Sequence, residues 1–430
     1  MIAREPVAGS MVAGAEPAAS LHTPPEALRI ATPAACARRF RVLVVGGGSA
    51  GLTIAARLRR LRPQLEVAVL EPSAAHYYQP LWTLVGGGVV AKEASRREQR
   101  DVIPDGVVWL REEASELQPE ASMVVTAAGE KIGYDVLVVC PGIALRWDRV
   151  AGLAEAVGRD GVCSIYAYEQ VDRVWQELRS FRGGTAVFTF PSTPVKCPGA
   201  AQKIMYLADD HFRRAGVRNK TRIVYVSPAP RIFGVDRYAR TLERVLARKG
   251  IETLFRHELV AVHADAREAV VRDLDTGAEE AIGYDLLHVV PPQAPPDVVA
   301  HSPLAGPGGW VEVDRATLQH IRYPSVFALG DASSLPTSKT GAAIRAQAPV
   351  AAANLLAHLD GRPLEARYDG YTACPLVTGY GKLVLAEFDY DGNPRETFPF
   401  DQSKERWSMY QLKRYGLPLL YWHGMLRGRA

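Results

Sequence analysis

Short apolar runs alternate with amphipathic stretches along most of the chain, and this alternation predicts β-strand, α-helix, β-strand units. Residues 40–61, FRVLVVGGGSAGLTIAARLRRL, predict a strand, a glycine turn and a helix, and LEVAVLEP at 65–72 predicts the next strand. A second series starts with GGTAVFTFP at 183–191, continues with a helix around 200–215 and ends with TRIVYVSP at 221–228. The two series predict an α/β fold with two separate units.

A repeated sequence supports the division into two units. IGYDVLVVCPG (132–142) and IGYDLLHVVPP (282–292) both place Ile-Gly-Tyr-Asp ahead of an apolar strand. Each repeat closes a unit of βαβ type, so we expect two Rossmann-like dinucleotide-binding domains.

The first unit carries a dinucleotide-binding pattern. Gly46, Gly48 and Gly51 have the spacing G-x-G-x-x-G, and Glu71 follows at the end of the next strand. Glycines let the backbone approach a pyrophosphate at a helix N-terminus, and an acidic residue about 20 positions further on binds the ribose hydroxyls. Strand, turn, helix and terminal acid together predict a dinucleotide site.

A later segment returns to the first domain. YPSVFALGDASSLPTSKTGAAIRAQAPVAAANLLAHL (323–359) predicts a strand that ends in Gly330-Asp331 and a helix of small residues. In two-domain flavoproteins a Gly-Asp pair at this place sets its carboxylate on the ribityl chain of the flavin. We therefore expect FAD as the first cofactor, with a plain strand-end turn as the alternative.

These patterns predict domain boundaries along the chain. We expect a disordered tail at 1–39 and an FAD domain formed by 40–155 and, on the return of the chain, by 300–365. A second Rossmann-like domain is expected at 156–299. The last region, 366–430, is expected to hold a redox cysteine and the contacts to quinone and membrane.

The second unit lacks the glycine pattern at the junction where NADH would bind. TFPSTPVKCPGAAQK (189–203) offers Gly199 alone and carries Cys197. Because proline favours the first position of a helix, the proline after Cys197 predicts that this cysteine lies at or next to the N-cap. The helix dipole and the charges of Lys196 and Lys203 would stabilise a thiolate there. The alternative is a small buried apolar residue.

The other cysteines differ in their context. Cys374, in YTACPLVTGYG, also precedes a proline, and its turn-rich surroundings predict an accessible loop. Cys140 ends a strand near the expected flavin; we expect it to be buried, with a third redox role as the alternative. Cys163 and Cys36 show no pattern that indicates function. The wide spacing of all five excludes a disulfide scaffold and predicts no metal site.

Composition excludes some classes of protein. A net charge of +4 over 430 residues does not indicate nucleic-acid binding, and no apolar run is long enough to predict a membrane-spanning helix. The ten lysines against forty-one arginines indicate the base composition of a genome, which we interpret as bacterial. Residues 1–39 hold five prolines and no periodic apolar pattern, so we exclude them from the fold.

The C-terminal stretch predicts contact with a lipid surface. RWSMYQLKRYGLPLLYWHGMLRGR (406–429) mixes aromatic and aliphatic residues with basic ones, namely Arg406, Lys413, Arg414, Arg427 and Arg429. This composition is typical of a segment that lies in the headgroup layer. The alternative is a C-terminal helix packed on the core.

Four long segments resemble the sulfide:quinone oxidoreductases, in particular the subgroup that includes the mitochondrial enzyme. They are HYYQPLWTLVGGG (76–88), FTFPSTPVKCPGAAQKIMYL (188–207), YDGYTACPLVTGYGKLVLAEFDY (368–390) and FPFDQSKERWSMY (398–410). The likeness runs from about residue 40 to residue 428. The family implies a flavoprotein related to glutathione reductase that lies on one membrane face, oxidises hydrogen sulfide through two cysteines, and passes electrons through FAD to quinone.

The resemblance assigns roles to residues. Cys197 and Cys374 match the redox pair, with Cys374 against the flavin and Cys197 as the persulfide carrier. The expected FAD contacts, which we take to be non-covalent, are Gly46, Gly48, Ser49, Ala50, Gly51, Glu71, Gln79, Ala114, Gly142, Gly330, Asp331 and Lys339. The expected quinone and membrane contacts are Gly341, Lys404, Tyr410, Tyr415, Leu419 and Trp422.

Other functions fit the residues less well. A type II NADH:quinone oxidoreductase has the same architecture but needs the missing second glycine pattern, and it leaves two cysteines unexplained. The flavoprotein subunit of a cytochrome-linked sulfide dehydrogenase would have no membrane-binding C-terminus. A flavoprotein without turnover would not need Cys197, Cys374 and Asp331.

We therefore expect hydrogen sulfide, a quinone, a small sulfur acceptor such as glutathione or sulfite, and a lipid surface as partners. We expect no binding of NAD(P), metal or nucleic acid. A homo-oligomer is compatible with the sequence. The expected location is one face of an energy-transducing membrane, interpreted as the bacterial cytoplasmic membrane. Members of the family continue past the position of Ala430 with a further amphipathic segment, so we expect weaker membrane attachment here.

Overall fold

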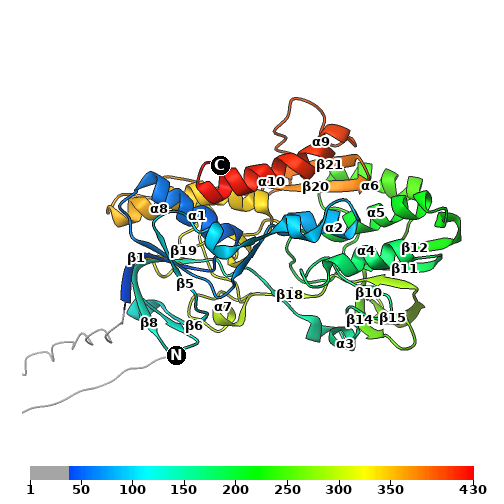
Figure 1. Ribbon diagram of the computed structural model, residues 1–430, viewed down its shortest axis with the longest axis horizontal. Coiled ribbons are helices and arrows are strands. Elements are labelled where there is room, and N and C mark those ends of the chain that lie inside the picture. Colours follow the sequence, from blue (N-terminus) through cyan, green and yellow to red (C-terminus); the bar gives the residue numbers. More distant parts are fainter. Residues whose placement is uncertain (1–37) are drawn as a thin grey trace, which may run out of the picture. The chain divides into compact units, whose positions relative to one another are not determined.

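The computed structural model describes residues 38–430 (Figure 1). The tail predicted for residues 1–39 lies outside this range except for its last two residues. Arg38 and Arg39, the last two residues of that predicted tail, belong to the first strand.

The first sheet has seven strands in the order β5-β2-β1-β8-β7-β6, with β19 paired to β8. Strands β5, β2, β1, β8 and β19 run parallel, and β7 and β6 are antiparallel. The bounds are β1 (Arg38–Val45), β2 (Val67–Leu70), β5 (Val107–Leu110), β6 (Ala114–Gln118), β7 (Met123–Thr126), β8 (Lys131–Val139) and β19 (Val326–Ala328). The parallel strands are apolar runs because both faces are covered.

Two long helices pack on this sheet and on each other. Helix α1 (Ser49–Leu61) follows β1 directly, and α8 (Gly341–Leu359) follows β19 after a loop. Val42 and Leu355 have no exposed surface and belong to one apolar core. The sheet thus joins a segment from the start of the fold to one some 300 positions later.

The second sheet has five parallel strands in the order β10-β17-β11-β12-β13. They are β10 (Val162–Cys163), β11 (Gly184–Thr189), β12 (Thr221–Ser227), β13 (Glu252–Phe255) and β17 (Leu286–His288). One face packs against α4 (Val171–Ser180), α5 (Ala200–Arg214) and α6 (Asp236–Lys249). The other packs against an antiparallel sheet of β14 (His257–His263), β15 (Glu268–Asp273) and β16 (Glu279–Gly283).

The C-terminal part consists of a hairpin and a helical run. Strands β20 (Thr372–Gly379) and β21 (Lys382–Phe388) form the hairpin. The run comprises α9 (Trp407–Gln411), the π-helix η8 (Leu412–Gly416), α10 (Leu417–Leu419), the π-helix η9 (Leu420–Gly424) and the 3₁₀ turn η10 (Met425–Arg427). Figure 1 shows this run in red, and its end packs against α1.

Short elements connect these parts. The strands are β3 (Ala75–Tyr77), β4 (Arg96–Glu98), β9 (Ala144–Leu145) and β18 (Gln293–Ala294), and the helices are α2 (Trp82–Gly86), α3 (Leu153–Ala156) and α7 (Asp297–Ala300). The remaining 3₁₀ turns are η1 (Gln79–Leu81), η2 (Lys92–Ser95), η3 (Gln99–Asp101), η4 (Pro119–Ala121), η5 (Trp147–Arg149), η6 (Arg218–Lys220) and η7 (Gly330–Ala332).

The predicted α/β class with two Rossmann-like units is confirmed. The repeated Ile-Gly-Tyr-Asp is used differently in the two units, however. In the first it lies inside β8, and in the second Ile282 and Gly283 end β16 while Asp285 precedes β17. The domain boundaries stay a prediction, because the described residues form one compact unit.

Candidate functional site

The turn between β1 and α1 has the geometry of a dinucleotide cradle. Gly46 has φ of +100°, and a Cβ there would lie 2.4 Å from the carbonyl oxygen of Cys140. A Cβ on Gly51 would lie 1.8 Å from the carbonyl oxygen of Gly46. A Cβ on Gly48 would meet no heavy atom within 4 Å, so the turn is open at this residue. The first and third glycines are required by packing, and the second faces free space.

Glu71 is attached to this turn. The Gly47 amide donates to Glu71 Oε2 at 2.8 Å and the Ser73 amide donates to Oε1 at 2.8 Å. Burial raises the pKa of the carboxyl, with the two amide bonds acting against burial. Ala114 begins β6 next to Glu113, whose charge acts on Glu71. Glu71, predicted to bind the ribose, and Ala114, predicted to contact the adenine, therefore lie on neighbouring segments.

The Gly-Asp pair lies at the end of β19, as predicted. Gly330 has φ of +72° and its amide donates to Gln347 Oε1 at 2.9 Å. Burial raises the pKa of Asp331, and the charges of Lys339 and Lys196 lower it. Lys339 Nζ donates to the carbonyl of Asp331 at 2.6 Å.

These surroundings fit FAD. Gly142 and Gly341 resemble Gly48 in that an added Cβ would meet nothing within 4 Å. Gly142 follows β8 and Gly341 begins α8, so open backbone occurs at the ends of neighbouring strands and at a helix N-terminus, where an anionic cofactor binds.

Cys197 lies in the loop between β11 and α5. Its φ is +49°, a left-handed conformation that costs a non-glycine residue about 1–3 kcal/mol. Two contacts fix it: the Cys197 amide donates to the Lys339 carbonyl at 2.7 Å, and the Tyr166 hydroxyl donates to the Cys197 carbonyl at 3.3 Å. Lys203 Nζ lies 3.1 Å from Cys197 Sγ.

The prediction that Cys197 lies at or next to the N-cap is wrong by one residue. The N-cap of α5 is Gly199, two positions later, because the strained turn at Cys197 and the proline after it precede the helix. The Gly199 amide instead acts to lower the pKa of Cys374. The helix N-terminus therefore acts on the other cysteine.

Cys374 is not in an accessible loop, which corrects our prediction. It lies inside β20, opposite Ala386, and has no exposed surface. Burial, followed by the charge of Cys197, raises the pKa of Cys374 to about 12, while Lys203 and the Gly199 amide lower it. The fold brings the two cysteines into electrostatic contact, and both are free thiols in this structure.

Lys413 is a site residue that the sequence analysis placed at the lipid interface. It is only 4% exposed, and its Nζ donates to the Pro80 carbonyl at 3.0 Å. Burial, followed by the charge of Lys203, lowers its pKa to about 7, and Cys197 and Cys374 raise it. The helical spacing could have predicted the burial of Lys413, because this residue lies four positions after the buried Met409.

A second unpredicted feature connects the glycine turn to the C-terminal run. The Tyr421 hydroxyl lies 2.8 Å from Ser49 Oγ and 2.6 Å from His76 Nε2. His76 Nδ1 lies 3.2 Å from the Gly47 carbonyl. Burial lowers the pKa of His76 to about 4, so its ring is neutral at physiological pH. Sequence patterns gave no signal for this contact.

The residues predicted for quinone and membrane fall into two groups. Tyr410 and Trp422 are buried, whereas Tyr415, Leu419 and Lys404 are exposed. Gly341 belongs to the open glycines described above. Gln79 begins η1 and is exposed.

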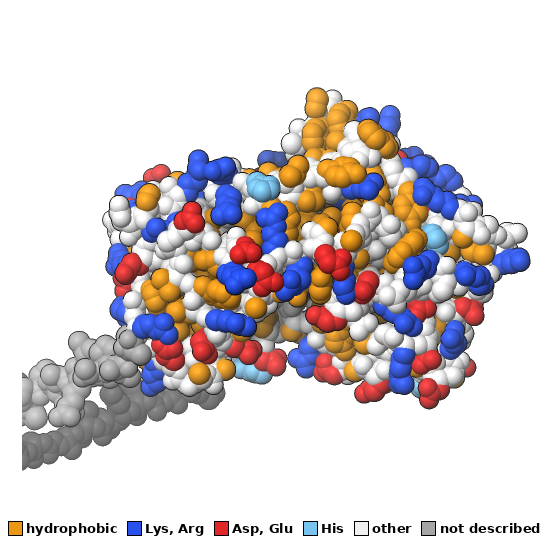
Figure 2. Space-filling view, in the orientation of Figure 1, with side chains coloured by type: hydrophobic (Ala, Val, Ile, Leu, Met, Phe, Trp, Pro, Cys, Tyr) orange, Lys and Arg blue, Asp and Glu red, His pale blue; other side chains and the backbone are white. Residues whose placement is uncertain are grey.

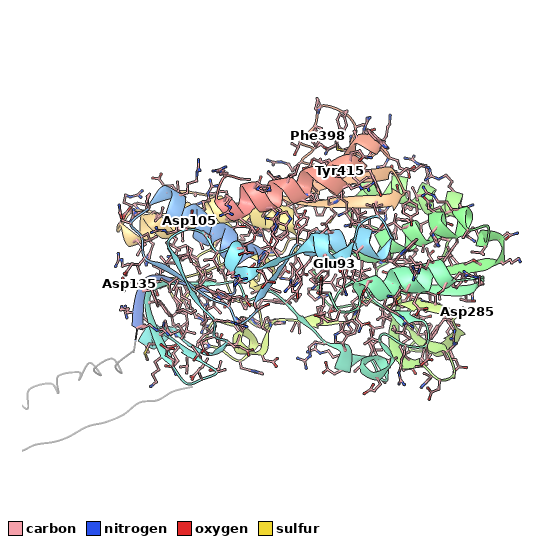
Figure 3. The ribbon with its side chains drawn as sticks, in the orientation of Figure 1. Glu93, Asp105, Asp135, Asp285, Phe398 and Tyr415 are labelled. Atoms are coloured by element: carbon pink, nitrogen blue, oxygen red, sulfur yellow. The ribbon has the colours of Figure 1, made fainter. Side chains whose placement is uncertain are left out.

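An apolar surface covers the outer side of the C-terminal run. Its exposed members are Trp407, Tyr415, Leu419 and Leu420, and Trp407 is 67% exposed. Figure 2 shows orange side chains gathered over this region, and Figure 3 shows Phe398 and Tyr415 there. We call these four exposed residues the C-terminal apolar surface. No helix in residues 38–430 is both long enough and apolar enough to cross a membrane.

The remaining cysteines have structural surroundings. Cys140 is buried, and its Sγ lies 3.8 Å from the Gly46 carbonyl. Burial raises the pKa of both Cys140 and Cys163 far above the usual value. In the described part of the chain, His, Cys, Asp and Glu form no group of three that could hold a metal ion.

Comparison with known proteins identifies the relatives of this chain. Residues 40–186 match the pyridine nucleotide-disulphide oxidoreductase family. The mitochondrial sulfide:quinone oxidoreductase of Mus musculus is 45% identical over 93% of this chain and 90% of its own length. That of Dictyostelium discoideum is 44% identical over 90% of this chain and 86% of its own length.

A solved structure shows the same fold. The sulfide:quinone oxidoreductase from the hyperthermophilic bacterium Aquifex aeolicus superposes with a TM-score of 0.79 and 22% identity, covering 91% of this chain and 92% of its own. The relatives with higher identity are named as mitochondrial and do not support a bacterial location. Together these relatives imply a flavoprotein with FAD. The chain belongs to the sulfide:quinone oxidoreductase family.

Proposed function

We propose that this protein oxidises hydrogen sulfide through Cys197 and Cys374 and delivers the electrons through FAD to a quinone. The observation that carries the proposal is the junction between β11 and α5. There, Cys197 and Cys374 interact electrostatically although they are far apart in the sequence. The ammonium of Lys203 lies 3.1 Å from the sulfur of Cys197.

The sulfur chemistry starts from a Cys197–Cys374 disulfide. Hydrosulfide, HS⁻, donates an electron pair to Cys197, a new S–S bond forms, and the Cys197–Cys374 bond breaks. The electron pair of the broken bond leaves on Cys374 as a thiolate, and the proton of HS⁻ stays on the outer sulfur. One negative charge enters and one remains, so the step balances.

The burial of the two residues decides which sulfur is attacked. Cys197 is partly exposed, whereas Cys374 has no exposed surface. The Gly199 amide and Lys203 act against the burial that raises the pKa of Cys374, and so offset part of the cost of a leaving thiolate there. Cys197 therefore carries the persulfide and Cys374 becomes the thiolate.

A small acceptor such as glutathione or sulfite then removes the outer sulfur from Cys197. The disulfide forms again when the two cysteines lose two electrons. FAD, when bound, would supply a two-electron acceptor and the connection to quinone. The residues that would hold it are the open glycines for the pyrophosphate, Glu71 for the ribose and Asp331 for the ribityl chain.

The same junction argues against NADH as the electron donor. A Cβ on Gly199 would lie 2.4 Å from Leu376 Cδ2, so β20 packs directly against the start of α5. The Gly199 amide, which would bind a phosphate in a dinucleotide site, instead acts on the pKa of Cys374. Both observations favour a junction that does not take a second pyrophosphate.

A titration tests the proposal. The FAD-loaded chain is mixed anaerobically with sulfide and, separately, with NADH, while the flavin absorbance is followed. We expect sulfide to bleach the flavin within the mixing time and NADH to leave it oxidised. Stoichiometric bleaching by NADH, with none by sulfide, would favour the type II NADH:quinone oxidoreductase.

The membrane part of the proposal rests on the C-terminal apolar surface. One of its aromatic side chains, Tyr415, lies with its ring centroid 4.9 Å from the Arg414 guanidinium, and such pairs of basic and apolar groups are typical of segments that bind anionic lipid. Through it the protein would lie on one face of a membrane and receive an apolar quinone.

Two leucine substitutions test this surface. Leu419 and Leu61 are 61% and 54% exposed, but only Leu419 belongs to the C-terminal apolar surface. We expect Leu419→Asp to reduce flotation with anionic liposomes several-fold, and Leu61→Asp to leave it unchanged. Equal flotation of all three proteins would contradict the assignment. A truncation is a poorer test, because it also removes the buried Tyr421.

A further inference from the structure

Lysines are concentrated at the cysteine site. The chain has ten lysines against forty-one arginines, so most of its cations are guanidinium groups. Four of the ten, Lys196, Lys203, Lys339 and Lys413, lie around Cys197, Cys374 and Asp331. Lysine is a compact point charge, which suits a small anion better than the wide planar fork of arginine.

Two of these lysines are buried without a carboxylate. Lys203 and Lys413 are 1% and 4% exposed, and neither forms an ion pair with Asp or Glu in residues 38–430. The contrast is Lys249, equally buried, which lies 2.9 Å from Asp209 Oδ2 and also pairs with Asp210. Burying an unpaired charge is costly, so such a group normally has a counter-ion.

The hydrogen-bonding capacity of the two ammonium groups is also unfilled. Each ammonium has three N–H donors. Lys203 uses one toward Cys197 Sγ, and Lys413 uses one toward the Pro80 carbonyl. Lys413 reaches this place from η8, a π-helical turn, and such turns are frequent at functional sites. Lys203 Nζ lies 3.1 Å from Cys197 Sγ, and both cysteines act electrostatically on Lys413.

We propose that Lys203 and Lys413 form the binding site for the hydrosulfide anion. This inference rests on the proposed function and names the ionic form of the substrate and the residues that hold it. In the disulfide state both cysteine sulfurs are neutral and neither lysine has an anionic partner within residues 38–430, so the arrival of an anion favours the charged form of Lys413. HS⁻ restores the balance and is held beside Cys197. After the attack, the negative charge resides on Cys374 and continues to compensate the lysines.

The first measurement is anaerobic stopped-flow bleaching of the FAD-loaded full chain at increasing sulfide concentration. Lys413→Met removes the ammonium and keeps much of the side-chain volume. We expect the half-saturating sulfide concentration to rise at least tenfold, while the limiting rate changes less than threefold. Lys203→Met should affect both quantities, because Lys203 also contacts Cys197. Lys220→Met, at an exposed position, removes the same charge and should match the wild type.

A thermal melt of the same proteins separates binding from structure. If Lys413 holds the anion, its removal relieves an uncompensated burial, and the melting midpoint stays or rises. A lower midpoint with unchanged half-saturation would show a structural lysine and overturn the proposal. An unchanged half-saturating sulfide concentration would overturn the proposal whatever the melting midpoint is.

A second measurement does not depend on sulfide or on a variant. The reduced wild-type protein is alkylated with iodoacetate, an anion, and with neutral iodoacetamide, and modification of Cys197 is followed by mass spectrometry. We expect the rate ratio of iodoacetate to iodoacetamide to exceed that of free glutathione by at least fivefold. A ratio equal to that of glutathione would overturn the anion site. If the alkylation ratio is high but sulfide does not bleach the flavin of the wild-type protein, the proposed function is overturned and the anion site is not.

Discussion

The turns before α1 and α5 occupy equivalent places in two similar βαβ units, yet they present different chemistry. In the first, Gly48 is open to solvent and the Gly47 amide is bonded to Glu71. In the second, the Gly199 amide acts to lower the pKa of Cys374, and Leu376 of β20 packs against the helix start. Under the proposed function, the same backbone feature, a helix N-terminus, would serve a phosphate in one unit and a sulfur in the other.

The charges around the two turns also differ in sign. The first turn has one carboxylate, Glu71, positioned for neutral hydroxyl groups. The second has lysines and lacks a paired carboxylate at Lys203 and Lys413. The comparison teaches that two Rossmann-like units with equivalent strands and helices can place opposite charges at the same turn.

The largest expected effect separates the two turns by function. Cys197→Ser and Cys374→Ser should each lower sulfide-dependent quinone reduction by orders of magnitude, because each sulfur is needed for capture or for leaving. Both variants should retain FAD, since the first turn is untouched. The measurements are steady-state quinone reduction and the flavin absorbance of the purified protein.

Controls for these variants are Cys36→Ser and Cys163→Ala, which we expect to behave as wild type; Cys140→Ser decides whether a third cysteine takes part. If either active-site variant keeps more than about a tenth of the activity, a loss below about 1.4 kcal/mol in the barrier, the two-cysteine mechanism is wrong.

A matched glycine pair gives the next largest effect. Gly51→Ala sets a Cβ 1.8 Å from the backbone oxygen of Gly46, which cannot move, so we expect protein without FAD. Gly199→Ala sets a Cβ 2.4 Å from Leu376 Cδ2 and should displace β20, which carries Cys374. We expect it to keep FAD and to bleach with sulfide about tenfold more slowly.

The double variant Gly199→Ala/Leu376→Ala makes room for the new methyl group and should recover part of the bleaching rate. Loss of FAD in Gly199→Ala would show that the two turns are not separate in function.

An ionic contact in the second unit joins α5, α6 and the end of the β20 strand. Asp210 on α5 pairs with Lys249 and accepts from the Tyr380 amide at 2.9 Å, at the end of β20. Asp210→Asn should destabilise the fold by about 1–3 kcal/mol, because a buried lysine loses one of its two partners. Urea unfolding measures this loss. Asp275→Asn, which breaks an exposed pair with Arg256, should change stability by less than about 0.5 kcal/mol.

The smallest effect is a pH dependence confined to the second turn. The pKa of Lys413 lies at about 7, so its charge is present below this pH and is lost as the pH rises. The groups that act on it are Lys203, Cys197 and Cys374. The apparent affinity for HS⁻, calculated from the concentration of the anion alone, should weaken above pH 7 by up to about tenfold per pH unit.

Lys413→Arg keeps its charge in this range and should remove the alkaline fall. An unchanged profile in that variant would assign the titration to another group. FAD retention, which depends on the first turn, should not follow this profile.

The first turn could be predicted from the sequence because its requirements are local. Gly46, Gly48 and Gly51 meet a backbone need within six residues, and Glu71 follows at a fixed distance. The Gly-Asp at 330–331 could be placed for the same reason.

The second turn could be predicted only in part, because its chemistry depends on distant packing. Cys374 precedes a proline, which suggested a loop. However, β20 pairs with β21 alone, and a strand with a free edge tolerates a proline without an N–H. The burial of Lys413 depends on which side of the C-terminal run meets the core, and its basic neighbours suggested the lipid side.

The bond between Ser49 and Tyr421 has a consequence for biosynthesis. These residues are 372 positions apart, yet Tyr421 meets both Ser49 and His76 beside the glycine turn. A ribosome therefore releases almost the whole chain before this turn acquires its final contacts, and the first sheet must likewise await β19. Flavin loading should accordingly be a late, post-translational event, and nascent chains lacking the last segment should bind the cofactor poorly.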